Sequence, residues 1–406
     1  MQIPHPPMPE TNSMGEVKVG IIGIGHIGSA HAKRIFSGDI KGLSLAAVCD
    51  IDPSRREYAE RELKDTAVYD KWRELIKSGL CEAVIIATPH KLHSQIAIEA
   101  LNAGLHVLTE KPQDITVTMA KRANEAAKKS GCVYGIMFNQ RTDPLFIRLR
   151  ELVKSGGLGE MKSLSWIITN WYRTQYYYDE GSWRATWSGE GGGVLMNQAV
   201  HNLDIMQWIF GMPKRLTAFC DTARYHDIEV EDAATIIASY ENGATAAFIT
   251  STGECPGTNR LEVCGTLGKA VVENGALKLW KLSRDEREIR VNEKAASPQI
   301  ELEYSEYVPE KNSAAPTAHA GVLQAFADCI LTGSPLIADG SEGINQLMLT
   351  NAAYLSQWQG NIPVELPING ELYDRLFAER AAASKEKTVS GKEINGSYSE
   401  RWSVKW

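Results

Sequence analysis

Near its start the chain reads Val17-Lys18-Val19-Gly20-Ile21-Ile22-Gly23-Ile24-Gly25-His26-Ile27-Gly28. The apolar first half predicts a buried strand, and the glycines that follow make a G-x-G-x-x-G turn into a helix. In such a turn the first glycine allows a tight bend, the second lets a pyrophosphate approach, and the third lets helix and strand pack closely. The N–H groups at the helix start then receive the phosphates. The stretch predicts a dinucleotide site, although a glycine-rich turn alone can also be purely structural.

An acidic residue follows at the right distance. A second apolar strand pattern, residues 43–48, ends at Cys49-Asp50. Asp50 lies 22 residues after Gly28, close to the spacing of the acid that binds a ribose hydroxyl. Its charge repels a 2′-phosphate, so the sequence favours NAD over NADP. Arg55 and Arg56 follow within one helical turn and can weaken that preference.

Strand and helix patterns alternate over residues 15–140. This α/β pattern predicts a doubly wound Rossmann domain that binds NAD, after a flexible arm at residues 1–14. Strand ends in such sheets face the ligand crevice, which places Thr88-Pro89 and Lys111 there. From spacing alone Lys111 is either a surface charge or an ammonium that stabilises a developing alkoxide. His90 and His93 fit loop or capping positions.

The pattern changes after residue 141. Alternating strand patterns with turn signals, including the hairpin signal Asn242-Gly243, predict an α+β domain at residues 141–370. This domain would hold a large, mostly antiparallel open β-sheet for substrate binding and oligomerisation. A C-terminal tail follows at residues 371–406.

Two features interrupt the strand pattern of the second domain. The first is a cluster of aromatic and arginine residues between 166 and 187, which suits either a sugar ligand or else an anchored loop or a subunit contact. The second is Gly191-Gly192-Gly193, predicted to open a buried helix through residue 206. Asn197 and His201 are four residues apart, so we expect them on one helical face, close to Asp204.

Bulk properties restrict the class of protein. The chain has 406 residues, of which 43% are hydrophobic and 23% charged, with a net charge of −7. We therefore expect two domains and no nucleic-acid or membrane partner. The seven cysteines are dispersed, which predicts reduced, buried thiols and a cytoplasmic protein, and no metal-ligand spacing is apparent. The open sheet and the terminal aromatics Tyr398, Trp402 and Trp406 predict a homo-dimer or homo-tetramer.

Taken together, these motifs resemble the glucose–fructose oxidoreductase / inositol dehydrogenase / rhizopine catabolism (Gfo/Idh/MocA) family. The resemblance spans residues 17–366 and rests on Gly23-x-Gly25-x-x-Gly28, Glu110-Lys111-Pro112, and the glycine run that leads to Asn197-x-x-x-His201. It implies that Lys111 contacts the reacting hydroxyl and that His201 is the general acid/base, with Asn197 as a further catalytic group.

The resemblance also implies the residues around the ligands. Those expected to surround the dinucleotide are Gly23, Gly25, His26, Ile27, Gly28, Asp50, Ile51, Thr88, Pro89, His93, Glu110, Lys111, Pro112 and Asn139. Those expected to contact substrate are Arg141, Trp171, Arg173, Tyr176, Trp183, Arg184 and Gln198.

One position departs from many sugar-alcohol dehydrogenases of this family, which have an aspartate where Asn197 stands. An amide orients a ring or a hydroxyl but cannot ionise, so Lys111 would carry more of the work. The Asn-Gln-x-x-His form resembles members that oxidise glycosides at the C3 hydroxyl. We therefore expect an NAD-dependent sugar or glycoside dehydrogenase. The alternatives are an NAD-dependent glycosidase that works by oxidation and elimination, and a non-catalytic, NAD-bound sugar sensor.

Overall fold

The computed structural model describes residues 15–310, 316–385 and 387. The terminal aromatics Tyr398, Trp402 and Trp406 lie outside the described residues. The chain forms two compact units. The first runs to Thr142 and takes in a later stretch that ends at Leu347, and the second begins at Asp143 and resumes at Met348.

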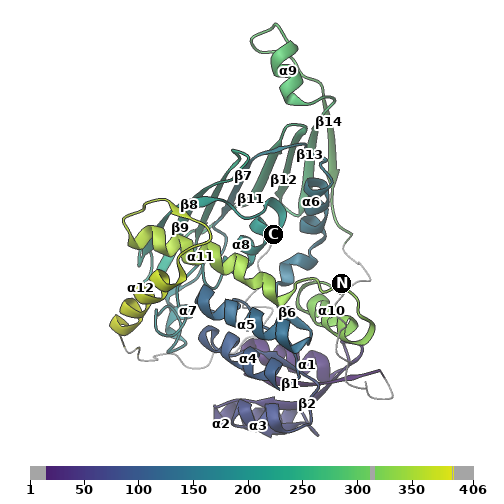
Figure 1. The fold of residues 1–406 in the computed structure, drawn as a ribbon, viewed down its shortest axis with the longest axis vertical. Helices are drawn as coiled ribbons and strands as arrows, with labels where there is room; N and C mark the ends of the chain where they lie inside the picture. The colour runs from purple at the N-terminus through teal and green to yellow at the C-terminus, as the bar shows by residue number, and fades with distance from the viewer. Residues whose placement is uncertain (1–14, 311–315, 386, 388–406) are drawn as a thin grey trace. The chain divides into compact units, whose positions relative to one another are not determined.

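The first unit is built on a six-stranded parallel sheet (Figure 1). Its strands are β1 (Val17–Ile22), β2 (Leu43–Cys49), β3 (Ala67–Tyr69), β4 (Ala83–Ile86), β5 (His106–Thr109) and β6 (Tyr134–Ile136). The helices between them are α1 (His26–Phe36), α2 (Pro53–Glu62), α3 (Trp72–Lys77), α4 (His93–Asn102) and α5 (Val117–Ser130). The strand order β3-β2-β1-β4-β5-β6 confirms the doubly wound Rossmann prediction. The order reverses between β1 and β4, where such sheets bind ligands.

A late helix completes the core of this unit. Helix α10 (Ala318–Thr332) buries Val322, Leu323 and Phe326 in the same apolar cluster as Val17 and Ile21. The sequence predicted an uninterrupted second domain at residues 141–370, whereas the structure returns this stretch to the first unit. The apolar face of α10 is the physical reason, because it packs into the same core as β1 and α1.

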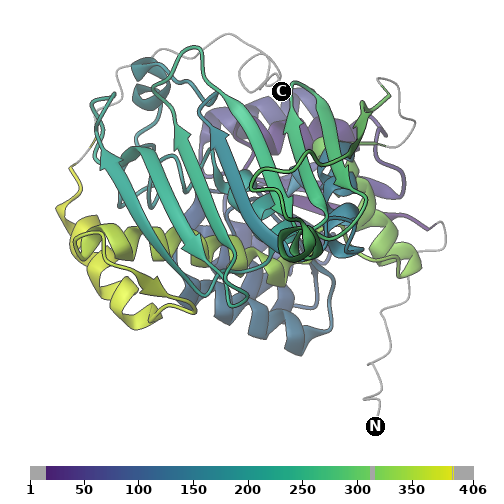
Figure 2. The same cartoon turned by 90° about the horizontal axis from the view of Figure 1, so that it is seen from above.

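The second unit is built on a nine-stranded sheet with the order β14-β13-β12-β11-β7-β10-β9-β8-β15 (Figure 2). Its strands are β7 (Met161–Ile168), β8 (Arg215–Thr222), β9 (Glu231–Ser239), β10 (Thr245–Ser251), β11 (Asn259–Gly265), β12 (Gly268–Glu273), β13 (Ala276–Leu282), β14 (Leu302–Tyr307) and β15 (Val364–Glu365). All neighbours pair antiparallel except β7 and β10. The mostly antiparallel sheet of the sequence analysis is confirmed.

One face of this sheet packs against helices. The helices of the second unit are α6 (Pro144–Lys154), α7 (Gln175–Asp179), α8 (Val200–Phe210), α9 (Glu286–Asn292) and α12 (Gly370–Ala383). Helix α11 (Gly343–Trp358) belongs to this unit from Met348 onward. Phe146 of α6 packs on Trp166 of β7, with ring centroids 5.7 Å apart. On the other face Phe219 and Ile237 are 53% and 48% exposed. The face is open as predicted, and the oligomer that would cover it stays a prediction.

Two general expectations can be compared with the described residues. Cys49, Cys81 and Cys220 are buried, as predicted. Cys132, Cys264 and Cys329 are only partly buried and Cys255 is exposed, so the prediction of buried thiols is wrong for Cys255. Among the helices of the described ranges, none has the length and apolar character that a membrane crossing requires.

Candidate active site

The glycine turn between β1 and α1 is closed on one side and open on the other. A Cβ on Gly23 would lie 2.6 Å from the carbonyl oxygen of Ala87, and one on Gly28 would lie 1.8 Å from that of Gly23. A Cβ on Gly25, in contrast, would meet no protein atom within 4 Å. Two glycines thus permit close backbone packing, and the middle one leaves space above the backbone at the start of α1. This is the arrangement that a pyrophosphate needs.

Asp50 reaches this turn from the end of β2. Its Oδ2 accepts the N–H of Ile24 (2.8 Å), and its Oδ1 accepts the N–H of Asp52 (3.0 Å). The two arginines that follow are also directed at the backbone. Arg55 Nε donates to the carbonyl of Ile24 (2.8 Å), and Arg56 Nη1 donates to that of Asp50 (2.9 Å). These contacts place one carboxylate and one guanidinium beside the glycine turn.

Replacing Asp50 by alanine is expected to shift the cofactor preference toward NADP. The change removes the carboxylate that the sequence analysis assigned to a ribose hydroxyl, together with its negative charge, while Arg55 stays beside the turn. Loss of a charged hydrogen bond predicts an affinity for NADH that is about 10–100-fold weaker. Titration of NADH and NADPH by fluorescence measures both affinities.

Asp52→Ala is the matched control for this prediction. Asp52 carries the same charge, but its side chain caps α2 by accepting the N–H of Ser54 (2.9 Å). The control should keep the preference of the wild type. An unchanged NADH-to-NADPH affinity ratio in Asp50→Ala would contradict the assignment of Asp50.

A buried histidine joins the ends of β4 and β5. His93 is fully buried at the start of α4. Its Nδ1 lies 2.7 Å from the carbonyl oxygen of Pro112, and its Nε2 lies 2.7 Å from that of Thr88. Burial lowers the pKa of His93, and a neutral imidazole donates to only one of the two carbonyls. His93 therefore braces the strand ends that carry the predicted cofactor residues Thr88 and Pro112.

Glu110, at the end of β5, is directed into the protein. Glu110 is 6% exposed, and its Oε1 accepts from Nε2 of His31 on α1 (2.8 Å). Burial acts to raise the pKa of Glu110, but the hydrogen bond and charge of His31 outweigh it and hold the pKa at about 2. The N–H of Lys111 donates to Oε2 of Glu110 (3.2 Å). Glu110 thus ties α1 to the turn after β5, whose next residue, Lys111, is half-buried.

In the second unit a buried carboxylate holds the glycine run before α8. Glu231, the first residue of β9, is 1% exposed. Its carboxylate accepts the N–H groups of Gly193 (3.0 Å) and Leu195 (2.9 Å) and the hydroxyl of Tyr354 (2.8 Å). Burial raises the pKa of Glu231 to about 7. A Cβ on Gly193 would lie 1.9 Å from the Glu231 carbonyl oxygen, so only glycine fits there.

The helix that the sequence placed directly after the glycine run begins later. Helix α8 starts at Val200, and the preceding residues form turns. The N–H of Ala199 bonds to the carbonyl of Val194 (2.7 Å), five residues back instead of four, which interrupts the helical pattern. The shared-face argument therefore holds for His201 and Asp204 but does not extend to Asn197. His201 is half-buried in the first turn of α8.

Several predicted substrate residues meet around one phenol. The hydroxyl oxygen of Tyr177 accepts from Arg184 Nη1 (2.7 Å), Gln198 Nε2 (3.1 Å) and Asn197 Nδ2 (3.3 Å). The Arg173 guanidinium lies 5.2 Å from the centre of the same ring. Burial raises the pKa of Tyr177, and the charge of Arg184 opposes this. Both alternatives for the aromatic cluster, a sugar platform and an anchored loop, fit this arrangement.

Other predicted residues lie elsewhere. Arg141 is 2% exposed and ion-paired with Glu342 within the first unit, because a buried guanidinium needs an acidic partner. Trp171 is 7% exposed and donates its indole N–H to Asn202 (3.1 Å). The remaining predicted residues take more accessible positions: His26 and Ile27 open α1, Ile51 follows β2, Pro89 follows β4, Asn139 follows β6, and Tyr176 and Trp183 flank the Tyr177 cluster.

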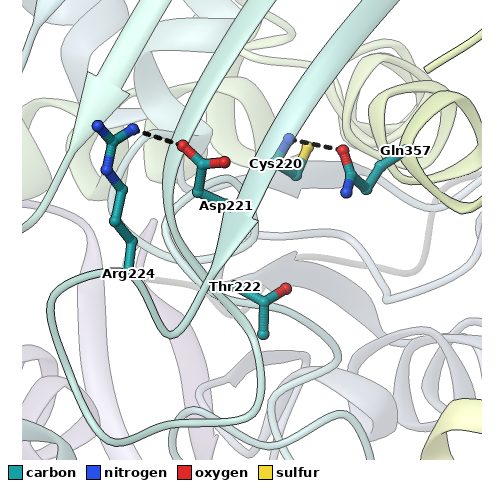
Figure 3. A pocket seen from close by; sticks show the side chains of 5 residues that line it. All are labelled: Cys220, Asp221, Thr222, Arg224 and Gln357. Atoms are coloured by element: carbon teal, nitrogen blue, oxygen red, sulfur yellow. Dashed lines mark hydrogen bonds and ion pairs between the residues drawn. The ribbon is translucent and has the colours of Figure 1, made fainter. Parts of the chain in front are cut away.

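A pocket of the second unit opens beside the ends of β8 and α11 (Figure 3). It is lined by Cys220, Asp221, Thr222, Arg224 and Gln357. Asp221 and Arg224 form an ion pair across it (2.6 Å), and Gln357 accepts the N–H of Cys220 (3.1 Å). Its lining includes no residue that the sequence predicted for a site.

Comparisons with known proteins agree with the geometry. Residues 17–138 match the model of an oxidoreductase family with an NAD-binding Rossmann fold, and residues 146–271 match the GFO/IDH/MocA C-terminal domain. The chain belongs to the Gfo/Idh/MocA family. It is an oxidoreductase, and its first unit is the NAD-binding domain of that family.

Relatives of this Gfo/Idh/MocA protein include proteins named as dehydrogenases. The scyllo-inositol 2-dehydrogenase (NAD(+)) of Bacillus subtilis is 25% identical over 87% of this chain and 97% of its own length. The myo-inositol 2-dehydrogenase of Thermotoga maritima is 26% identical over 64% of this chain and 75% of its own. The WlbA dehydrogenase of Bordetella pertussis, solved with NADH and UDP-GlcNAcA, matches with a TM-score of 0.72 at 25% identity, over 87% of this chain and 100% of that chain.

The sequence analysis missed three polar groups of these sites. Glu231 has the position of an ordinary strand residue, and Tyr354 that of an apolar helix residue, so no local pattern marks their contact. Glu190 immediately precedes the glycine run. A charged residue next to three glycines was the signal that could have singled it out.

Proposed function

We propose that the protein moves a hydride between a ring hydroxyl carbon of a sugar or glycoside, at C3, and the nicotinamide of NAD. The open space over Gly25, beside the carboxylate of Asp50, is the observation that carries the cofactor part. The substrate class is supported by relatives named for inositols, and the C3 position by the Asn197-Gln198-x-x-His201 form.

The residues near the glycine turn fit NAD. Asp50 would hold the adenosine ribose, the turn from Gly23 to Gly28 would receive the pyrophosphate, and the strand ends with Thr88 and Pro112 would border the nicotinamide. The chemistry that NAD supplies when bound is hydride acceptance at its nicotinamide ring.

Side chains of the protein would take up the proton of the substrate hydroxyl and bind its oxygen. His201 takes the hydroxyl proton as the carbon becomes a carbonyl, a general-base role that imidazoles often have in enzymes. The Lys111 ammonium binds the same oxygen and stabilises its charge. Asn197 and Gln198 orient neighbouring hydroxyls, and Arg184 with the aromatic cluster binds the sugar face.

The test is the absorbance of NADH with the purified protein, NAD, and a panel of glycosides and free polyols, with products followed by mass. Growth of NADH with loss of two hydrogens from one sugar is the expected result. Release of free sugar without net NADH would point to the glycosidase. No turnover on any panel member, together with sugar binding, would contradict the proposal in favour of a sensor.

A further inference from the structure

Glu190 is a buried carboxylate in direct contact with a predicted catalytic residue. It is 2% exposed and lies in the turn before the glycine run. Its Oε2 accepts the N–H of Ala185 (2.6 Å), and its Oε1 accepts the side-chain amide of Asn197. Burying a carboxylate is costly unless such hydrogen bonds compensate it. A glutamate at this position therefore needs a reason beyond packing.

The contact determines which way the Asn197 amide points. An ionised carboxylate only accepts hydrogen bonds, so it is the nitrogen of the amide that must face Glu190. The same nitrogen also donates to the hydroxyl oxygen of Tyr177 (3.3 Å). With both N–H groups directed at these two partners, the carbonyl oxygen Oδ1 is turned to the opposite side.

The backbone around Glu190 keeps the carboxylate in place. The N–H groups of Glu190 and Gly191 both donate to the carbonyl of Thr186 (3.0 and 3.1 Å). Ala185, which donates to the carboxylate, has a positive φ of 54°, a conformation that non-glycine residues adopt only when their surroundings hold them. The turn is thus shaped around the carboxylate.

We propose that Glu190 is a positioning residue for the reaction, and this rests on the proposed function. Its carboxylate fixes Asn197 so that the amide offers a carbonyl oxygen, an acceptor, to a sugar hydroxyl. It also places a negative charge beside position 197, where many sugar-alcohol dehydrogenases of the family have an aspartate. Through Tyr177 the same group supports Gln198 and Arg184, so Glu190 links the predicted catalytic and substrate residues.

The first variant is Glu190→Gln. A glutamine has one acceptor oxygen and one amide nitrogen. If the oxygen accepts the N–H of Ala185, the nitrogen faces Asn197, and the Asn197 amide must turn over to accept from it. We expect kcat on the sugar identified in the panel to fall about 10–100-fold, the scale of a misplaced reacting group. The affinity for NADH should stay unchanged. Glu229→Gln, which removes the same charge from a half-buried neighbour, is the control and should keep wild-type kcat and KM.

The reciprocal variant separates positioning from a purely structural role. Asn197→Asp alone sets two carboxylates against each other and should lower kcat. In the double variant Glu190→Gln/Asn197→Asp, the glutamine amide donates to the new carboxylate, which again turns an acceptor oxygen outward. We expect the double variant to regain at least tenfold in kcat over Glu190→Gln. A structural role predicts lower melting temperatures with kcat unchanged in the folded enzyme.

Each result for these variants either supports or overturns the positioning role of Glu190. A folded Glu190→Gln enzyme with wild-type kcat and KM overturns the inference, as does a double variant no faster than the slower single variant. An active wild type in those cases leaves the proposed dehydrogenase standing. A wild type that turns over no sugar on the panel overturns the proposed function, and this inference falls with it.

Discussion

Replacing His201 by alanine is expected to lower kcat by about 10²–10⁴, the usual scale for a lost general acid/base. The imidazole is half-buried in the first turn of α8 and is the group proposed to accept the hydroxyl proton. Its loss leaves the alkoxide to be formed with only the Lys111 ammonium for stabilisation. NADH titration should give the wild-type affinity, since the glycine turn and Asp50 belong to the other unit. Steady-state turnover on the sugar found in the panel measures the effect.

His201→Asn serves as the companion variant. Asparagine keeps a polar side chain at the half-buried site, so it separates lost packing from lost proton transfer. We expect its melting temperature to be close to that of the wild type while kcat stays low. Turnover at the wild-type rate in either variant would remove His201 from the mechanism.

The second large effect is expected at the third glycine of the turn. In Gly28→Ala the new Cβ would lie 1.8 Å from the carbonyl oxygen of Gly23 and 2.9 Å from its carbonyl carbon. Both are backbone atoms, so α1 must move away from β1. Overpacking typically costs about 1–3 kcal/mol of unfolding free energy, and we expect the upper end because neither atom is on a flexible side chain. Thermal unfolding without cofactor measures this loss.

Gly25→Ala is the control, which should keep the stability of the free protein but lose the stabilisation by NADH. A Cβ there meets open space, and the backbone already has φ −63°, so the free protein should keep its stability within about 0.5 kcal/mol. The methyl group would occupy the space for a pyrophosphate. The wild type should gain about 2.7 kcal/mol at 100 Kd of NADH, and Gly25→Ala should lose most of this gain. Equal stabilisation by NADH in the two proteins would show that the phosphates lie elsewhere.

Local sequence patterns predicted the first unit well because its strands and its glycine turn are each specified by residues that are close together in the sequence. The run from Val17 to Ile22 forms the buried strand, and the glycines after it form the turn. Asp50 reaches that turn as its spacing suggested. The return of α10 to this unit was not predictable from local pattern, because an apolar helix face does not specify which sheet it will cover.

The polar groups of the second unit were even less predictable from local sequence patterns. The spacing of Asn197 and His201 implied one helix, but Glu231 binds the N–H groups of Gly193 and Leu195 and holds that segment in turns. Glu231 is distant in sequence and has no motif of its own. Glu190 likewise acquires its importance only from a contact with Asn197. Such roles depend on which side chains are brought together, and one sequence does not reveal that.

The late return of α10 also has a consequence for synthesis on the ribosome. The cluster that includes Val17 and Ile21 is closed by Val322, Leu323 and Phe326. The strands β7 to β14 all precede this helix in the chain. A nascent chain therefore carries the complete run of these strands before its amino-terminal core can close. The amino-terminal core is thus incomplete until α10, residues 318–332, has left the ribosome.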